Sequence, residues 1–223
     1  MVGRSRMAEV DLLDRYPRTR RDIAARAAAV PAQREVAKQF AREYFDGERG
    51  QGYGGYRYDG RWEPIATRMR DFYGLRAGDR VLDVGCAKGF LLHDLRRVVG
   101  GVRVAGLDIS AYALGQAMDD VRPFLVRGSA ERLPFADQAF DLVVSINTLH
   151  NLDRADCIRA LGEIERVSRR HRYVQVDSWL DETQREKFER WQLTALTYSD
   201  PEGWRRLFRE AGYAGDYYWT VTE

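Results

Sequence analysis

Apolar residues follow two kinds of pattern along this chain. Short apolar runs bounded by glycine or acidic residues predict strands, and segments with apolar residues three and four positions apart predict helices. The predicted strands begin near residues 81, 102, 140, 173 and 215, and the helices between them include Pro64 to Tyr73, ended by Gly74, and Ala155 to Val167. Because strands and helices alternate from residue 63, we predict a doubly wound, mostly parallel α/β sheet of six or seven strands.

The first 62 residues show no strand pattern. We predict one helix over residues 20–30 and a second that starts at Pro31, a favoured first helical position, and ends at Gly47. Glycines and aromatic residues then dominate from Gly50 to Trp62, and four glycines in the first six residues disfavour a helix. We interpret residues 1–62 as an N-terminal helical lid on a domain of residues 63–223; the alternative for the glycine-rich loop is a disordered hinge.

Charge and cysteine content exclude several classes of function. The 223 residues carry a net charge of +2 from 36 basic and 34 acidic side chains, which gives no basic face for duplex nucleic acid. Cys86 and Cys157 are far apart and form no C-x-x-C pair, so neither a zinc site nor a disulfide framework is indicated. No apolar stretch approaches about 18 residues, and the N-terminal region is rich in charge. We therefore expect a cytoplasmic protein without a membrane partner.

The most informative segment is Val-Leu-Asp-Val-Gly-Cys-Ala-Lys-Gly at residues 81–89, which a helical pattern follows at once. A strand, a tight turn and a helix in this order form the nucleotide-binding corner of α/β sheets. Gly85 and Gly89 lack a Cβ and let the backbone approach a ligand closely. The spacing departs from the G-x-G-x-x-G of dinucleotide sites, and the carboxylate of Asp83 would repel a pyrophosphate but suit an ammonium group.

This loop resembles the first motif of the class I S-adenosylmethionine-dependent methyltransferases, an acid-x-G-x-G-x-G sequence in which Ala87 stands here for the middle glycine. Three further segments resemble later motifs in the family's order. Val102 to Asp108 resembles the second strand, whose final carboxylate would bind the ribose hydroxyls or cap the following helix, and the two roles can coexist. Gly128 to Phe135 resembles the segment along the adenine ring, with Ser129 where the family often has an acid. Phe140 to Leu152 resembles the fourth strand and the loop after it.

The resemblance implies a Rossmann-like methyltransferase fold with S-adenosylmethionine as the cofactor. It also implies a set of cofactor-binding residues: Asp83, Gly85, Cys86, Ala87, Gly89, Asp108, Ile109, Ser129, Ala130, Glu131 and Asn147. Elements before the first motif would shape the acceptor pocket, here through Tyr53, Tyr56, Arg57, Arg61 and Trp62. For a hydroxyl acceptor, His150 after the fourth strand is a general base or a structural hydrogen-bonding residue, and Tyr58 is the second catalytic candidate.

The residues after the fourth strand set several subclasses aside. Asn147-Thr148-Leu149 lacks the Pro-Pro-aromatic motif of amino-methylating nucleic-acid enzymes, and Asn147 is a poor magnesium ligand, so we expect neither nucleic acid nor metal. What remains is a small-molecule methyltransferase, monomer or homodimer, that acts on an oxygen of a sugar-like or natural-product intermediate. Arg57, Arg61 and Lys88 favour an anionic acceptor. The rivals are a non-catalytic cofactor-binding module and a nicotinamide-dependent oxidoreductase, which the missing dinucleotide motif disfavours.

Overall fold

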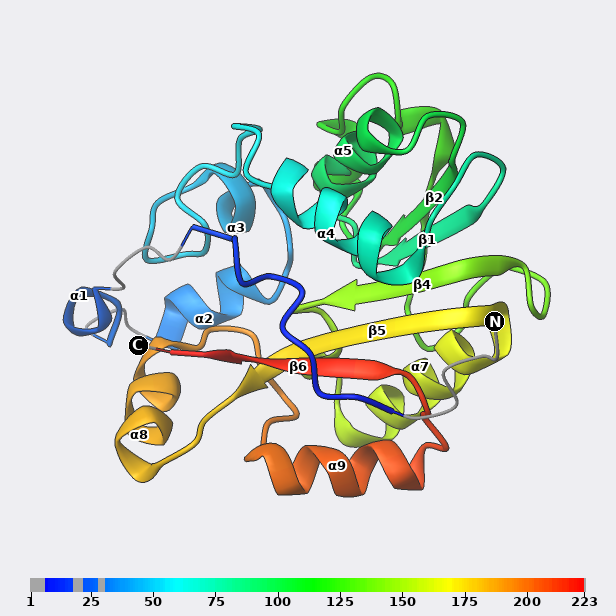
Figure 1. The fold of residues 1–223 in the computed structure, drawn as a ribbon. Helices are drawn as coiled ribbons and strands as arrows, with labels where there is room; N and C mark the ends of the chain where they lie inside the picture. Colours follow the sequence, from blue (N-terminus) through cyan, green and yellow to red (C-terminus); the bar gives the residue numbers. More distant parts are fainter. Residues whose placement is uncertain (1–6, 18–21, 28–30, 223) are drawn as a thin grey trace.

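A parallel sheet forms the centre of the protein in the computed structural model, which describes residues 7–17, 22–27 and 31–222 (Figure 1). The six strands of the described chain stand in the order β3-β2-β1-β4-β5-β6, and every neighbouring pair is parallel. Their bounds are β1 Arg80–Val84, β2 Arg103–Asp108, β3 Leu125–Arg127, β4 Phe140–Ile146, β5 Ser168–Ser178 and β6 Asp216–Val221. The predicted α/β sheet is therefore confirmed, with six strands.

Helices cover both faces of the sheet, as the doubly wound prediction requires (Figure 1). Their bounds are α1 Ile23–Ala27, α2 Pro31–Ala37, α3 Arg42–Asp46, α4 Glu63–Tyr73, α5 Phe90–Val98, α6 Ala111–Gly115, α7 Arg154–Val167, α8 Glu182–Trp191 and α9 Pro201–Glu210. One apolar cluster joins α4 and α5 to the sheet and includes Val81 of β1. A second cluster joins α7 and α9 to it and includes Leu82 and Val84 of the same strand. A strand buried on both sides needs the continuous apolar run seen here.

The helix ends that the sequence predicted most sharply are present. Gly74 follows α4 in a left-handed conformation (φ +62°), and its N–H donates to Arg70 O. The Asp153 side chain accepts a hydrogen bond from Asp156 N–H and starts α7, the helix expected over residues 155–167. No helix within the described residues is long and apolar enough to cross a membrane.

The second predicted helix is interrupted. α2 ends at Ala37, α3 starts at Arg42, and between them Phe40 adopts a left-handed conformation with a φ of +47°. The Phe40 carbonyl oxygen accepts a hydrogen bond from Ser110 Oγ, so the break is tied to the segment after β2. The prediction of one helix from Pro31 to Gly47 is wrong because this long-range contact overrides local helical preference. Of the helix expected over residues 20–30, the part at 22–27 is described, and it contains α1.

The N-terminal residues pair with the far edge of the sheet. Val10 N–H donates to Tyr217 O (2.9 Å) and Tyr217 N–H donates to Ala8 O (3.0 Å), which places residues 8–10 beside β6. Leu12 is fully buried in the cluster of α4 and α5. Residues 7–17 therefore pack on the sheet domain, although the sequence pattern grouped them with the lid. An edge strand gains from such a partner because its outer N–H and C=O groups are otherwise left to solvent.

Two helices after β5 were not predicted, and one of them supports the N-terminal region. α9 buries Trp204 and Phe208 against the sheet. α8 lies against α1, where the Arg26 guanidinium stands 3.9 Å from the centre of the Trp191 ring. The same guanidinium donates a hydrogen bond to Arg49 O (2.7 Å), so α1, α8 and the glycine-rich loop meet at one point.

Candidate active site

Residues 85–89 connect β1 to α5, and we call them the glycine loop, as distinct from the glycine-rich loop of residues 50–62. Their backbone has the shape of a ligand cradle. Gly85, Ala87 and Gly89 adopt left-handed conformations, with φ of +88°, +48° and +74°. A Cβ on Gly85 would collide with the side chain of Thr148, so glycine is required there. Ala87 takes the conformation that a middle glycine adopts more easily, and its N–H donates to Asp108 Oδ2 (2.7 Å).

Asp108 ends β2 and fixes the glycine loop. Its second carboxylate oxygen, Oδ1, accepts a hydrogen bond from Ser110 N–H (2.8 Å), and the residue is buried. Burial raises the pKa of this carboxyl, and the backbone N–H donors oppose the rise. The alternative role of helix cap is wrong for Asp108, because Ser110 Oγ caps α6 by accepting from Ala113 N–H (3.0 Å). The four lone pairs of the Asp108 carboxylate exceed the number of its backbone donors, which leaves an acceptor site for a ligand hydroxyl.

Asp83 places a buried carboxylate in β1, next to the glycine loop. The residue is 6% exposed, and its side chain has no ion pair or hydrogen bond among the described residues. Burial raises the pKa of this carboxyl to about 7, with a further contribution from Asp108. A buried carboxylate without a counter-charge is costly, and a cationic ligand group would remove that cost. The site therefore fits the ammonium group that the sequence analysis placed beside Asp83.

The predicted adenine-side residues meet at the ends of β2 and β3. Gly128 N–H donates to Asp108 O (3.0 Å), which brings the segment of Ser129, Ala130 and Glu131 next to the end of β2. Ile109 is 54% exposed directly after the buried Asp108, whereas Ala130 is buried. The exposed isoleucine supplies an apolar surface at the place where the family resemblance puts the adenine ring.

Asn147 lies on the other side of the site from these residues. It has a left-handed conformation (φ +53°), and its Oδ1 accepts a hydrogen bond from Thr220 Oγ1 of β6 (2.8 Å). Its N–H donates to Gln175 O of β5 (2.8 Å). The neighbouring Thr148, which the sequence analysis did not single out, is the residue that contacts the glycine loop.

His150 is buried at the end of β4 and faces Asp177 with both ring nitrogens. Asp177 N–H donates to His150 Nδ1 (3.3 Å), and His150 Nε2 lies 3.4 Å from Asp177 Oδ2. The His150 carbonyl oxygen accepts from the N–H groups of Leu196 and Thr197, which fixes the backbone as well. Sequence reasoning missed Asp177, although an acid directly after the apolar residues of the fifth strand was the available signal.

Residues 40–58, which we call the covering segment, lie over the glycine loop and α5. The Tyr56 ring stacks on Phe90 at the start of α5 (4.9 Å between ring centres) and contacts Tyr53 (4.6 Å). The Phe45 ring stacks on Tyr112 of α6 (6.4 Å). Two of the predicted acceptor residues, Tyr53 and Tyr56, therefore lie beside the cofactor loop.

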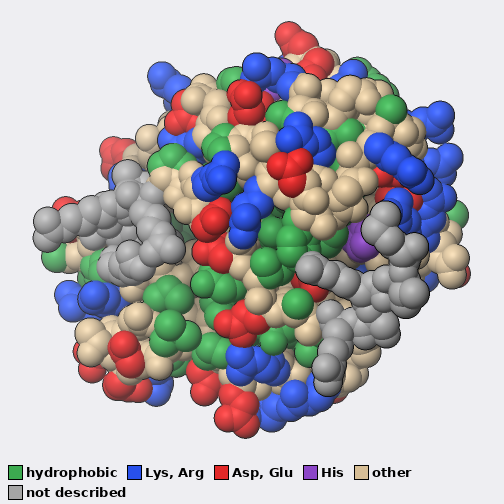
Figure 2. Space-filling view, viewed as in Figure 1, with side chains coloured by type: hydrophobic (Ala, Val, Ile, Leu, Met, Phe, Trp, Pro, Cys, Tyr) green, Lys and Arg blue, Asp and Glu red, His purple; other side chains and the backbone are tan. Residues whose placement is uncertain are grey.

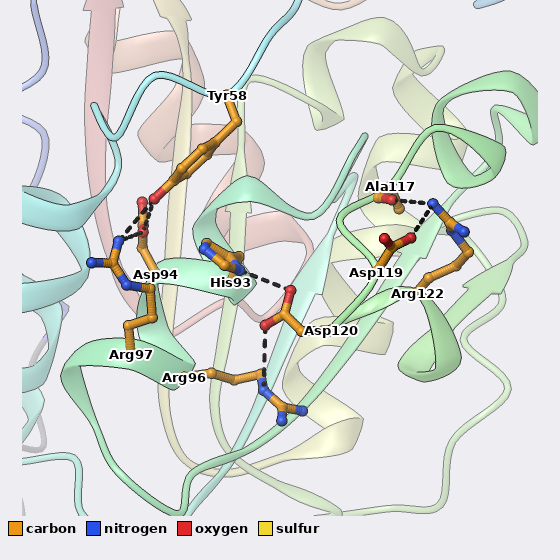
Figure 3. Close-up of polar contacts among 9 residues, drawn as sticks. All are labelled: Tyr58, His93, Asp94, Arg96, Arg97, Ala117, Asp119, Asp120 and Arg122. Atoms are coloured by element: carbon orange, nitrogen blue, oxygen red, sulfur yellow. Dashed lines mark hydrogen bonds and ion pairs between the residues drawn. The ribbon is translucent and has the colours of Figure 1, made fainter.

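Tyr58 contacts the flank of α5 and not His150. Its hydroxyl donates to Asp94 Oδ1 (2.6 Å) and accepts from Arg97 (3.0 Å), as Figure 3 shows. The residue before Asp94 in the same helix contacts the segment before β3, because His93 Nδ1 lies 2.8 Å from Asp120 Oδ1. The two catalytic candidates, Tyr58 and His150, therefore have different partners and do not form one catalytic pair. The contacts of Tyr58 attach the covering segment to α5.

The basic residues expected near the acceptor are mostly paired. Arg61 forms an ion pair with Asp59, and the Lys88 ammonium lies 2.6 Å from Asp46 Oδ2. Arg57 is exposed. Trp62, directly before α4, was expected in the acceptor pocket. It is buried, and its ring contacts the Tyr16 ring (4.9 Å between ring centres), so it belongs to the core.

Figure 2 shows one face of the molecule, with acidic and basic side chains over much of it. Hydrophobic side chains gather where the N-terminal segment crosses the sheet edge.

Several of the proteins that this chain resembles are named as methyltransferases. A family model described as a methyltransferase domain matches residues 81–171. The chain is 30% identical over 199 residues to the 2-phytyl-1,4-naphtoquinone methyltransferase of Synechocystis sp., a match that covers 82% of this chain and 79% of that protein. It is 32% identical over 110 residues to the 27-O-demethylrifamycin SV methyltransferase of Amycolatopsis mediterranei, covering 46% of this chain and 40% of that protein.

The extent of these matches differs. The chain spans less than half the length of several curated relatives that it matches. A solved S-adenosylmethionine-dependent methyltransferase from Aquifex aeolicus shares the fold, with a TM-score of 0.51, 19% identity and coverage of 82% of this chain and 88% of that one. The methyltransferase match includes the glycine loop and the strands around it, which overturns the nicotinamide-dependent alternative.

Proposed function

Because this chain belongs to the class I S-adenosylmethionine-dependent methyltransferases, we propose that it transfers a methyl group from S-adenosylmethionine to a small-molecule acceptor. The observation that carries this proposal is the buried carboxylate of Asp83 beside the left-handed glycine loop, to which no described residue supplies a hydrogen bond or an ion pair. When bound, the cofactor supplies a sulfonium whose methyl group is already electrophilic. The protein therefore needs to bind both partners, align them and exclude water.

The residues of the site fit the cofactor part by part. Asp83 would pair with its amino group, and the bare backbone of residues 85–89 would lie against it. Asp108 would accept hydrogen bonds from the ribose hydroxyls with the lone pairs that its backbone donors leave open. Ile109 and residues 129–131 would border the adenine ring.

The acceptor that we propose is an uncharged, ring-bearing small molecule of the natural-product type that offers a hydroxyl oxygen. The named relatives act on a naphtoquinone and on a rifamycin, both small molecules. The aromatic side chains of Tyr53 and Tyr56 suit a flat ring. Arg61 and Lys88 already pair with carboxylates, which weighs against the anionic acceptor expected from their positions alone.

For a hydroxyl acceptor, we assign proton transfer to the His150–Asp177 pair. Because Asp177 N–H donates to Nδ1, the proton of a neutral His150 ring lies on Nε2 and faces the Asp177 carboxylate. Neither nitrogen is left open toward an acceptor. The proton would therefore pass from the acceptor hydroxyl to the Asp177 carboxylate, which the His150 Nε2–H group holds in place.

Cofactor binding and turnover test this function separately. S-adenosylhomocysteine should bind in a calorimetric titration with a Kd near micromolar, about −8 kcal/mol. Hydroxylated naphthalenes and sugar-like alcohols, each paired with its phosphorylated analogue, should then be incubated with S-adenosylmethionine and assayed for S-adenosylhomocysteine by mass spectrometry. No binding at millimolar ligand would refute the function. Binding without turnover of any compound would favour the non-catalytic module, and turnover of phosphorylated members alone would refute the acceptor class.

A further inference from the structure

Asp46, the last residue of α3, collects hydrogen bonds from three separate segments. Lys88 Nζ donates to Asp46 Oδ2 (2.6 Å), and the Tyr112 hydroxyl donates to the same oxygen (2.7 Å). Tyr56 N–H donates to Oδ1 (3.0 Å). One carboxylate of the covering segment is thus joined to the glycine loop, to α6 and to the glycine-rich loop.

Lys88 makes this contact costly to lose. It stands within the glycine loop between Ala87 and Gly89, and it is 6% exposed. Its ammonium also donates to Tyr56 O (2.8 Å), so both of its hydrogen-bond acceptors come from the covering segment. A buried ammonium deprived of its carboxylate partner is strongly destabilised. The glycine loop in this conformation therefore depends on the covering segment being in place.

The second connection reaches the segment that follows Asp108. Ser110 Oγ donates to Phe40 O at the start of the covering segment, and Tyr112 reaches Asp46 from α6. Ser110 N–H also donates to Asp108 Oδ1. The covering segment therefore holds both of the segments assigned to the cofactor, the glycine loop and the end of β2.

Asp46 is ionised in this arrangement at neutral pH. Partial burial raises the pKa of its carboxyl, and the hydrogen bonds from Lys88, Tyr112 and Tyr56 outweigh that effect, so the pKa lies below its ordinary value. The contact is therefore a charge-assisted hydrogen bond between an ammonium and a carboxylate, which is stronger than a neutral pair.

We propose that Asp46 is a positioning residue for the cofactor: its carboxylate locks the covering segment onto Lys88 and Tyr112, so that the closed segment and the cofactor-binding shape of the glycine loop form together. The proposal rests on the proposed function for the identity of the cofactor. Its consequence is kinetic. Cofactor exchange requires the Asp46–Lys88 contact to open, and a protein without that contact should release its ligand faster.

The test compares Asp46→Asn with Asp59→Asn in the full-length protein. Asp59 is a matched control because it lies just beyond the covering segment and pairs with the half-buried Arg61, whereas Asp46 pairs with the buried Lys88. Dissociation of S-adenosylhomocysteine is followed by stopped-flow tryptophan fluorescence. Asp46→Asn should speed release by about tenfold, the effect of losing a charge-assisted hydrogen bond, and Asp59→Asn should match the wild type.

Limited trypsin digestion without ligand gives a second readout that does not depend on the cofactor. Arg49 and Arg57 are exposed in or beside the glycine-rich loop, and cleavage there should be faster in Asp46→Asn than in either other protein. Equal release rates and equal cleavage in Asp46→Asn and wild type would overturn the proposal. Failure of the wild type to bind S-adenosylhomocysteine would refute the proposed function, and the digestion would still decide whether Asp46 holds the segment closed.

A milder variant covers the case in which Asp46→Asn does not fold. Tyr112→Phe keeps the Asp46–Lys88 pair and removes one donor to the carboxylate. It should shift ligand release and trypsin cleavage in the same direction by a smaller factor, about threefold. A Tyr112→Phe protein that behaves as wild type in both measurements would contradict the role of α6 in the lock.

Discussion

Cofactor affinity is expected to depend on pH through Asp83. Burial raises the pKa of this carboxyl from its ordinary value of 3.8 to about 7, and Asp108 adds to the rise. A cationic ligand group beside Asp83 favours the ionised form, so binding should release a proton. The ionised fraction of a group with this pKa falls about tenfold between pH 8 and pH 6, and the affinity should fall by about the same factor, about 1.4 kcal/mol.

Calorimetry of S-adenosylhomocysteine binding at about pH 6 and about pH 8 measures this dependence. Repeating the titration in buffers of different ionisation enthalpy counts the protons released. Asp83→Asn removes the titrating group, so the variant should bind more weakly at the higher pH and lose the pH dependence. His150→Gln is the control, because it removes a histidine and should keep the dependence. A constant wild-type affinity, or an unchanged slope in Asp83→Asn, would refute the reasoning.

The same pKa shift affects folding with the opposite sign. Because the folded-state pKa of Asp83 lies above the ordinary value, its contribution to stability is fully present below about pH 4 and is lost as the pH rises through about 7. The loss is about 4 kcal/mol for a shift of this size. Urea denaturation should show Asp83→Asn gaining stability relative to wild type on the alkaline side. An equal difference between the two proteins on both sides of this range would contradict the assignment.

Three further variants test other parts of the structure. Asp108→Ala should weaken S-adenosylhomocysteine binding by about 1.5–3 kcal/mol in calorimetry, because it removes a charge-assisted acceptor and frees the Ala87 N–H; unchanged affinity would contradict the ribose role. His150→Gln and Asp177→Asn should each lower kcat by about 10²–10⁴ once an acceptor is known, and the double variant should cost little more than either, whereas additive losses would show that the two act separately. Leu12→Ala should cost about 2–5 kcal/mol in urea denaturation, against a smaller loss for the half-buried Leu13→Ala; equal small losses would mean that the N-terminal segment is not part of the core.

The parts of the fold that the sequence predicted are those set by local chemistry. Gly74 ends α4 because a left-handed residue without a Cβ follows the last turn, and the strand and turn of residues 81–89, directly before α5, are encoded within nine positions. The parts that it did not predict depend on distant residues. Phe40 breaks the expected helix where Ser110 holds its carbonyl, and residues 8–10 are extended because β6 offers an edge. No pattern within either segment carries that information.

The candidate site also has one half that local sequence predicts and another that depends on distant residues. Its cofactor half, Asp83 to Gly89 with Asp108, is a short motif in which Gly85 and Gly89 favour the left-handed backbone and Ala87 adopts it with its N–H bound to Asp108. Its acceptor half is assembled by the covering segment and by His150 and Asp177, which lie 27 positions apart in the sequence and which β5 brings together. The covering segment contacts the glycine loop through Lys88, so the two halves of the site are in contact. Only the cofactor half is recognisable in the sequence. Changes at Tyr53 or Asp177 should therefore alter acceptor use with little effect on cofactor affinity, whereas a change at Asp46 should affect both.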